Sequence, residues 1–169
     1  MRRLLNTAYR LLDLDLLEDP AASTAWLKGE GFSPEMPLRK RHVTRLIDFR
    51  ETMRSVAASD SVTNEGIEWL FDETIETAIR FRVIDGVPHV VGAAEDASDR
   101  YVDTLTVILG EAVREGSWAR FKICANPDCR WAFYDHSKNS SGRWCSMEYC
   151  GSRAKISTFR AKNRPSPDS

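Results

Sequence analysis

The sequence predicts an α+β protein in which a mostly helical N-terminal domain with one small β-hairpin is followed by a compact C-terminal module. Three observations predict this organisation. Apolar residues recur at helical spacing over most of the first 118 residues, one short stretch alternates with a period of two, and all four cysteines lie between positions 124 and 150. A chain of 169 residues can form one main core and one small satellite module.

The two parts differ in charge. Residues 1–119 contain 14 Lys and Arg against 21 Asp and Glu, a net charge of −7. Residues 120–169 contain 10 Lys and Arg against 4 Asp and Glu, a net charge of +6. The basic C-terminal part is therefore the candidate for binding a polyanion.

The composition also predicts where the protein works. No run of 18 apolar residues occurs, so we expect no membrane partner. The first ten residues lack the sustained apolar region of a secretion signal. Because the cysteines are clustered rather than spread through the chain, we expect a reducing, cytoplasmic location.

The first helices follow from the apolar spacing. Leucines recur from Leu4 to Leu17 and predict a helix over these residues, which Asp19-Pro20 ends. Pro20 can open a short second helix through Leu27, because proline at the first helical position loses no hydrogen bond. A longer helix is predicted from about Leu38 to Ala58.

Two further helices and a hairpin complete the predicted N-terminal domain. Thr63 or Asn64 caps one helix, and the other runs from about Asp99 to Gly116. Between them the period changes to two in Ile79–Ile84, Asp85-Gly86 is a turn signal, and the alternation returns in Val87–Val91. We expect no enzyme, because no nucleophile–base pair and no phosphate-binding glycine loop is visible. His42 and His89 are isolated and are predicted to be structural.

The cysteines form the pattern C-x4-C, fifteen residues, C-x4-C, through Cys124, Cys129, Cys145 and Cys150. Zinc prefers four ligands in a tetrahedron, and two matched pairs at this separation predict one structural Zn²⁺ held by four thiolates. Such a closed shell leaves no open position for catalysis. Four buried free thiols, a redox pair, and His136 as a replacement ligand are the alternatives. Because metal supplies much of the folding energy of so short a segment, zinc removal should unfold the module and leave the N-terminal domain largely intact.

The residues around the cysteines predict a treble-clef-like zinc finger. The first pair lies on a turn, and the fifteen-residue interval can form a hairpin with Trp131, Phe133 and Tyr134 in its first strand and Ser137–Gly142 at its tip. Ser146 is a candidate N-cap for a helix that carries Cys150 and ends near Arg160 or Lys162. Ile156 and Phe159 of that helix are predicted to pack back on the body.

Basic residues of this module predict contacts to nucleic acid, because arginine and lysine neutralise phosphates and arginine can read guanine edges. The candidates are Arg130, Lys138, Arg143, Arg153, Lys155, Arg160 and Lys162. DNA is the favoured partner, while an RNA partner, a protein partner and a homodimer remain open. Trp131 and Trp144 are predicted to be core or interface anchors rather than base-stacking groups.

These residues resemble the CGNR zinc finger family of bacterial proteins. The matching stretches are Trp131–Asp135, Ser137–Asn139, Arg143–Met147 and Cys150–Arg153, the last with Ser152 in place of the family's Asn. The N-terminal part is similar to the ABATE domain, described as a stress-induced transcription regulator, through Asn6-Thr7, Trp26-Leu27 and Phe49–Glu51.

The resemblance implies a DNA-binding transcription regulator of bacterial stress response, whose N-terminal domain senses a ligand or mediates association. The expected division of the chain is an ABATE-like domain over residues 1–118, a CGNR-like zinc finger over 119–164 and a disordered tail over 165–169.

Overall fold

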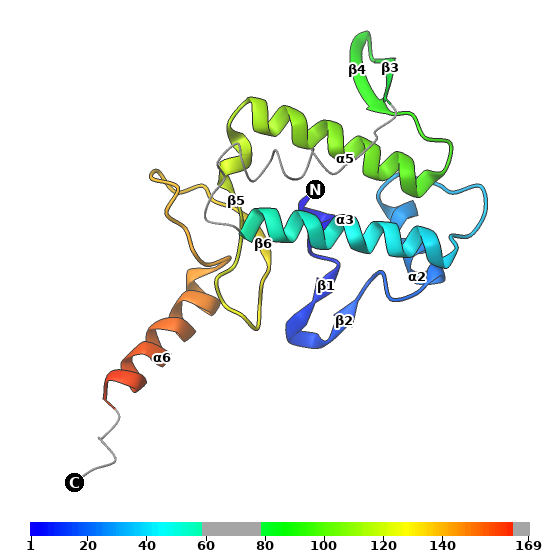
Figure 1. The fold of residues 1–169 in the computed structure, drawn as a ribbon. Helices are drawn as coiled ribbons and strands as arrows, with labels where there is room; N and C mark the ends of the chain where they lie inside the picture. The colour runs from blue at the N-terminus through cyan, green and yellow to red at the C-terminus, as the bar shows by residue number, and fades with distance from the viewer. Residues whose placement is uncertain (59–78, 164–169) are drawn as a thin grey trace.

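The computed structural model describes residues 1–58 and 79–163, and its elements are arranged around two long helices (Figure 1). None of the helices in these two ranges is long and apolar enough to cross a membrane. In chain order the elements are α1 (Arg2–Leu5), β1 (Ala8–Tyr9), the 3-10 turn η1 (Arg10–Leu12), β2 (Leu14–Asp15), α2 (Pro20–Gly29), α3 (Lys40–Ala58), β3 (Ile79–Ile84), β4 (Val87–Gly92), α5 (Ala97–Arg114), the 3-10 turn η2 (Ser117–Arg120), β5 (Phe121–Ile123), β6 (Ala132–Tyr134), the π-helical turn η3 (Met147–Gly151) and α6 (Ser152–Lys162). This mixture of helices and small hairpins confirms the general fold class.

Helices α3 and α5 contact each other at the centre and confirm two of the predicted helices. α5 begins at Ala97 because the Asp96 side chain accepts hydrogen bonds from the amides of Ser98 and Asp99. It ends before Gly116, whose φ of 71° suits glycine. The core around them is apolar and includes Leu4, Leu5, Leu27, Leu46, Met53, Leu105, Leu109, Trp118, Phe121 and Ala132.

The segment from Leu4 to Leu17 is not one helix, so that prediction was wrong. α1 ends at Leu5, and β1 pairs antiparallel with β2 around η1. The Thr7 hydroxyl donates to the Leu4 carbonyl at 2.8 Å, which competes with helix continuation, and Asp13 has a left-handed φ of 50°. Leu4, Leu5 and Leu17, at the ends of the segment, are buried, whereas Leu11, Leu12 and Leu14, in its middle, are exposed. The leucines therefore do not share one face.

The remaining N-terminal helix predictions have different outcomes. α2 begins at Pro20 as predicted, because the Asp19 carboxylate accepts from the amides of Ala21 and Ala22. The helix predicted to be capped by Thr63 or Asn64 lies outside the described residues.

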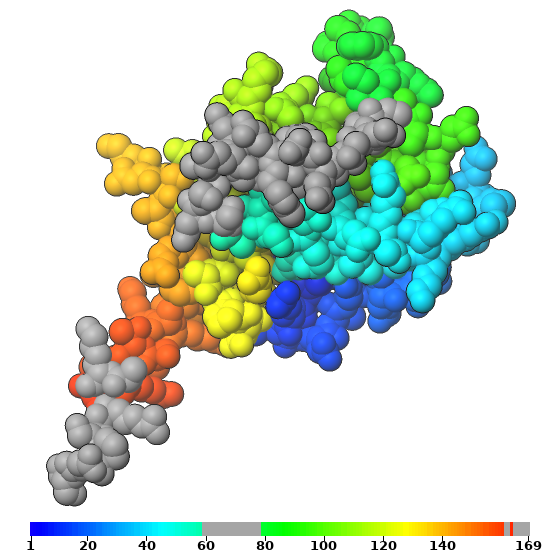
Figure 2. Space-filling model, viewed as in Figure 1, coloured from blue at the N-terminus to red at the C-terminus, as the bar shows by residue number. Residues whose placement is uncertain are grey.

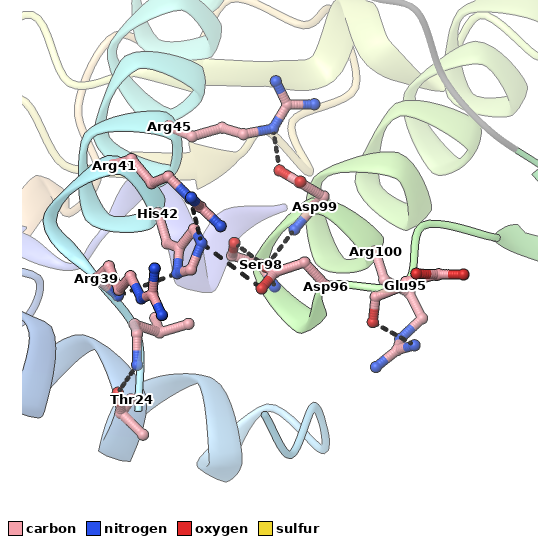
Figure 3. Close-up of polar contacts among 11 residues, drawn as sticks. Thr24, Arg39, Arg41, His42, Arg45, Glu95, Asp96, Ser98, Asp99 and Arg100 are labelled. Atoms are coloured by element: carbon pink, nitrogen blue, oxygen red, sulfur yellow. Dashed lines mark hydrogen bonds and ion pairs between the residues drawn. The ribbon is translucent and has the colours of Figure 1, made fainter. Parts of the chain in front are cut away.

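Polar side chains connect the beginning of α3 to the beginning of α5 (Figure 3). The His42 Nδ1 accepts from the Arg39 amide at 3.0 Å, and His42 Nε2 lies 3.7 Å from the Asp96 carboxylate. Burial alone would raise the pKa of Asp96, but hydrogen bonds from Ser98 and the neighbouring His42 lower it. These contacts give His42 a structural place between two helices.

The predicted hairpin is present as β3 and β4, which pair antiparallel. Its turn contains Asp85 and Gly86, both with positive φ, as the Asp-Gly signal predicts. β4 packs on α5 at Gly92, where an added Cβ would lie 2.5 Å from the Arg100 carbonyl oxygen. All six β3 side chains are exposed.

Candidate metal centre

The first cysteine pair lies in the loop of a hairpin. β5 pairs antiparallel with β6, and Cys124 and Cys129 lie between these strands. The Asn126 carbonyl accepts from the amides of Cys129 and Arg130, both at 3.0 Å, which makes the predicted turn. The hairpin predicted between the two cysteine pairs is wrong, because β6 pairs with the strand before Cys124 rather than with residues after 142.

The second pair lies at the beginning of the C-terminal helices. Ser146 is the N-cap, as predicted, and its hydroxyl accepts from the Tyr149 amide at 3.3 Å. Gly151 permits a close approach, because an added Cβ would lie 2.7 Å from the Met147 sulfur. Ser152, which stands where the CGNR pattern has Asn, donates to the Met147 carbonyl at 3.0 Å. The tight turn η3 thereby presents Cys150 next to Cys145.

The four sulfurs come together as predicted. All lie within 4.8 Å of one another, with 3.7 Å between Cys129 and Cys145 and 3.8 Å between Cys145 and Cys150. Four thiolates about 2.3 Å from a tetrahedral zinc ion lie about 3.8 Å apart. A disulfide would need sulfurs about 2 Å apart, and all four cysteines are free. The cluster therefore fits one structural zinc ion, in a shell that His136 does not enter.

The protonation of the thiols depends on their burial. Burial raises the pKa of Cys129 and of Cys145, and neighbouring thiols contribute. Burial alone would also raise the pKa of Cys150, but hydrogen bonds, including one from the Asn126 amide at 3.7 Å, lower it. A divalent cation would compensate the charge of the buried thiolates and release their protons as it binds.

Comparison with known proteins agrees with this geometry. Residues 120–163 match the CGNR zinc finger family. The matched segment contains all four cysteines and extends from the end of η2 to the residue after α6. Among curated proteins, none matches the chain. The segment is called the CGNR finger below.

Asp135 holds the loop of the CGNR finger between its two cysteine pairs. Its carboxylate accepts from the amides of Ser137 at 2.9 Å and Gly142 at 2.7 Å, and it pairs with the Lys122 ammonium at 2.8 Å. The Lys122 hydrogen bond, with those from Ser137 and Gly142, holds the pKa of Asp135 well below its ordinary range. Gly142 has no room for a Cβ, which would lie 2.7 Å from Asp135 Oδ1. Sequence reasoning missed this role, although Asp135 ends the aromatic stretch of the family pattern.

Asn6 joins the CGNR finger to the N-terminal helices. Its side chain is buried, donates to the Ala132 carbonyl at 2.9 Å and accepts from the Ala132 amide at 2.8 Å. The Tyr9 ring meets the Trp131 ring edge-on with centroids 4.9 Å apart, so Trp131 anchors the same junction. The Asn6-Thr7 motif marked this position in the sequence, but no sequence signal connected it with a partner 126 residues away.

Five of the seven predicted nucleic-acid contacts are exposed. The side chains of Lys138, Arg143, Arg153, Lys155 and Arg160 are exposed, whereas Arg130 is half-buried and the side chain of Lys162 lies outside the described part of the chain. Helix α6 extends from the body, and its main contact is with η3 (Figures 1 and 2). Ile156 and Phe159 are 51% and 68% exposed. The prediction that they pack back was therefore wrong, because α6 points away from the body instead of crossing it.

Proposed function

We propose that the protein is a zinc-containing bacterial transcription regulator that binds DNA through its CGNR finger and works in the cytoplasm. Helix α6 carries this proposal. Residues 152–162 include no Asp or Glu, and Arg153, Lys155 and Arg160 are exposed along the helix. A projecting helix with cations and no acidic residue meets the electrostatic requirement for binding phosphates.

The zinc site supports this role by fixing the beginning of α6. Cys150 is a zinc ligand within η3, and α6 continues directly from η3. We propose a treble-clef-like arrangement, in which the first knuckle lies in the loop of the β5–β6 hairpin and a helix follows the last ligand. Arg143 and Lys138 are exposed on the preceding loop and extend the cationic surface. We leave Arg130 out of this surface because its Nε is enclosed.

For the N-terminal part we propose an ABATE-like domain over residues 1–118, without enzymatic activity, that senses a ligand or mediates association. Two residues of the resemblance, Thr7 and Arg50, support this, because they meet in a buried network with Asp15. The Arg50 Nη1 donates to the Thr7 hydroxyl at 2.9 Å and to the Asp15 carboxylate at 2.7 Å. Burial alone would raise the pKa of Asp15, but the bonds from Arg50 and the Leu17 amide lower it.

A protein-interaction module or an RNA-binding module is the alternative. The exposed apolar side chains of Tyr149, Ile156 and Phe159 favour it. Tyr149 lies on η3 and the other two lie on α6 with its cations, so all three could contact a partner protein or stack on unpaired bases.

Binding to labelled duplex DNA and to single-stranded RNA, measured by anisotropy over a salt series, tests the proposal. We expect tighter binding to DNA than to RNA. A plot of the logarithm of the DNA association constant against the logarithm of salt concentration should have a slope of about −0.9 for each phosphate that the protein neutralises. The double charge reversal Arg153→Glu with Lys155→Glu should abolish DNA binding while zinc content stays at one ion per chain.

The matched control is Lys28→Glu with Lys40→Glu, which makes the same charge change at exposed positions of the body. The control should bind DNA almost as well as the wild type. Equal loss in both variants, or tighter binding to RNA, would contradict DNA binding through α6.

A further inference from the structure

Arg54 is a buried arginine with one hydrogen-bond partner in the described part of the chain. It lies near the end of α3, is 2% exposed, and its Nη2 donates to the Arg130 carbonyl at 2.7 Å. Among the described residues, nothing accepts a hydrogen bond from Arg54 Nε or Nη1, and the buried Nε of Arg130 is likewise without a partner. Buried guanidinium groups in folded proteins are normally paired, so these donors need an acceptor.

The charges around Arg54 point to an anion. Burial lowers the pKa of Arg54, Glu51 opposes this effect, and Arg10, Arg50 and Arg130 are close enough to lower the pKa further. Both neighbouring carboxylates are already committed to Arg50, Asp15 at 2.7 Å and Glu51 at 2.8 Å. Among the described residues, the guanidinium groups of Arg54, Arg10, Arg50 and Arg130 therefore exceed the carboxylates of Asp15 and Glu51 by two charges.

We propose that a small phosphate-bearing anion binds at the junction of α3 and the first zinc knuckle, held by Arg54 and Arg130 with Arg10 at the solvent edge. The planar fork of arginine matches phosphate oxygens, and a dianion matches the excess charge. A small anion fits better than a nucleic-acid backbone, because Arg54 is buried whereas Arg10 is exposed. The site is distinct from α6 and does not depend on the proposed function.

The position of the site gives the anion a structural consequence. Arg54 belongs to α3, while Arg130 directly follows the zinc ligand Cys129 and has a left-handed φ of 49°. An anion between their guanidinium groups joins the N-terminal helices to the zinc knuckle, next to the bond that Arg54 already donates to the Arg130 carbonyl.

Calorimetric titration of the zinc-loaded chain with inorganic phosphate tests the proposal, with chloride at matched ionic strength as the reference. We expect one phosphate per chain and a melting temperature that rises with phosphate. Arg54→Met should weaken phosphate binding by at least about tenfold, since it removes charge-assisted hydrogen bonds. The control Arg45→Met, at a partly exposed position of the same helix, should bind phosphate like the wild type.

The absence of saturable phosphate binding to the wild type would overturn the proposal. If Arg54→Met does not fold, Arg10→Met at the exposed edge serves instead and should also weaken phosphate binding. The double variant of Arg153 and Lys155 separates the two sites, because it should lose DNA and keep phosphate. Loss of phosphate binding in that variant would assign the anion to α6 and refute the site at Arg54.

Discussion

The loop from Asp135 to Ser146 contains no helix or strand, and side-chain bonds give it its shape. One buried carboxylate, that of Asp135, accepts from two amides of the loop and from Lys122, and Lys122 in turn donates to the carbonyls of Ser140 and Gly142. These hydrogen bonds fix the conformation of the loop between the two cysteine pairs.

We expect Asp135→Asn to lower the free energy of unfolding by about 2 kcal/mol at pH 7, because the half-buried Lys122 loses its counter-charge and one amide loses its acceptor. Urea unfolding measures the change. The control Asp128→Asn, at an exposed position of the same finger, should change stability by less than about 0.5 kcal/mol.

The same pair of variants has a defined pH dependence. Because folding lowers the pKa of Asp135, its stabilisation is complete above the ordinary Asp pKa of about 3.9 and is lost as the pH falls through the lower folded value. The stability difference between wild type and Asp135→Asn should be constant from pH 8 to 5 and shrink below pH 4, with zinc content followed in parallel. A difference that grows as the pH falls would contradict this role.

At the scale of elements, the sequence predicted correctly those helix starts and that hairpin which depend on neighbouring residues in the chain. The start of α2 was predicted from Pro20, that of η3 from Ser146 as the N-cap, and β3 and β4 from alternation around Asp85-Gly86. The failures concern pairing over distance. Of the three residues predicted in a strand, Phe133 and Tyr134 lie in β6 and Trp131 directly precedes it. Alternation cannot say that the partner strand is β5 rather than the residues after 142.

Asn6 gives the clearest test of such a distant pairing, because its side-chain amide bonds the backbone of Ala132 in β6 as a neighbouring strand would. We expect Asn6→Ala to lower the free energy of unfolding by about 2–4 kcal/mol, since it leaves the buried amide and carbonyl of Ala132 unpaired. Asn139→Ala, at an exposed position, is the control and should be nearly neutral. Equal unfolding midpoints in urea for the two variants would show that Asn6 does not join the two parts.

At the scale of the whole molecule, the predicted boundary near residue 118 is crossed by one core. Phe121 and Ala132 of the CGNR finger belong to the same buried cluster as Leu4 and Leu5, while the cysteines form a second, smaller cluster with Trp131, Phe133 and Trp144. Charge and cysteine clustering predicted two bodies, but composition carries no information on how much surface they share. The division into domains stays a prediction.

This shared core changes the expected outcome of zinc removal. Structural zinc contributes on the order of 10 kcal/mol to small modules, so chelation should unfold the CGNR finger. Because Asn6 and Arg54 would then lose their bonds to Ala132 and Arg130, protection should also fall in α1 and the last turns of α3. Hydrogen exchange read by mass spectrometry, before and after chelation, measures this at each segment.

Two variants distinguish the effect of losing zinc from other effects of the chelator. Cys145→Ser should reproduce the chelated pattern without chelator, because it removes one of four ligands, whereas His136→Ala should keep zinc and protection. α2 should stay protected in every case, since its described contacts are with the N-terminal helices. If exchange rises only after residue 120, the two parts fold independently and the core contacts of Phe121 and Ala132 contribute little. If α1 opens together with the finger, zinc binding stabilises the N-terminal helices across a distance of more than 100 residues in sequence, and the metal site is part of the fold of the whole chain.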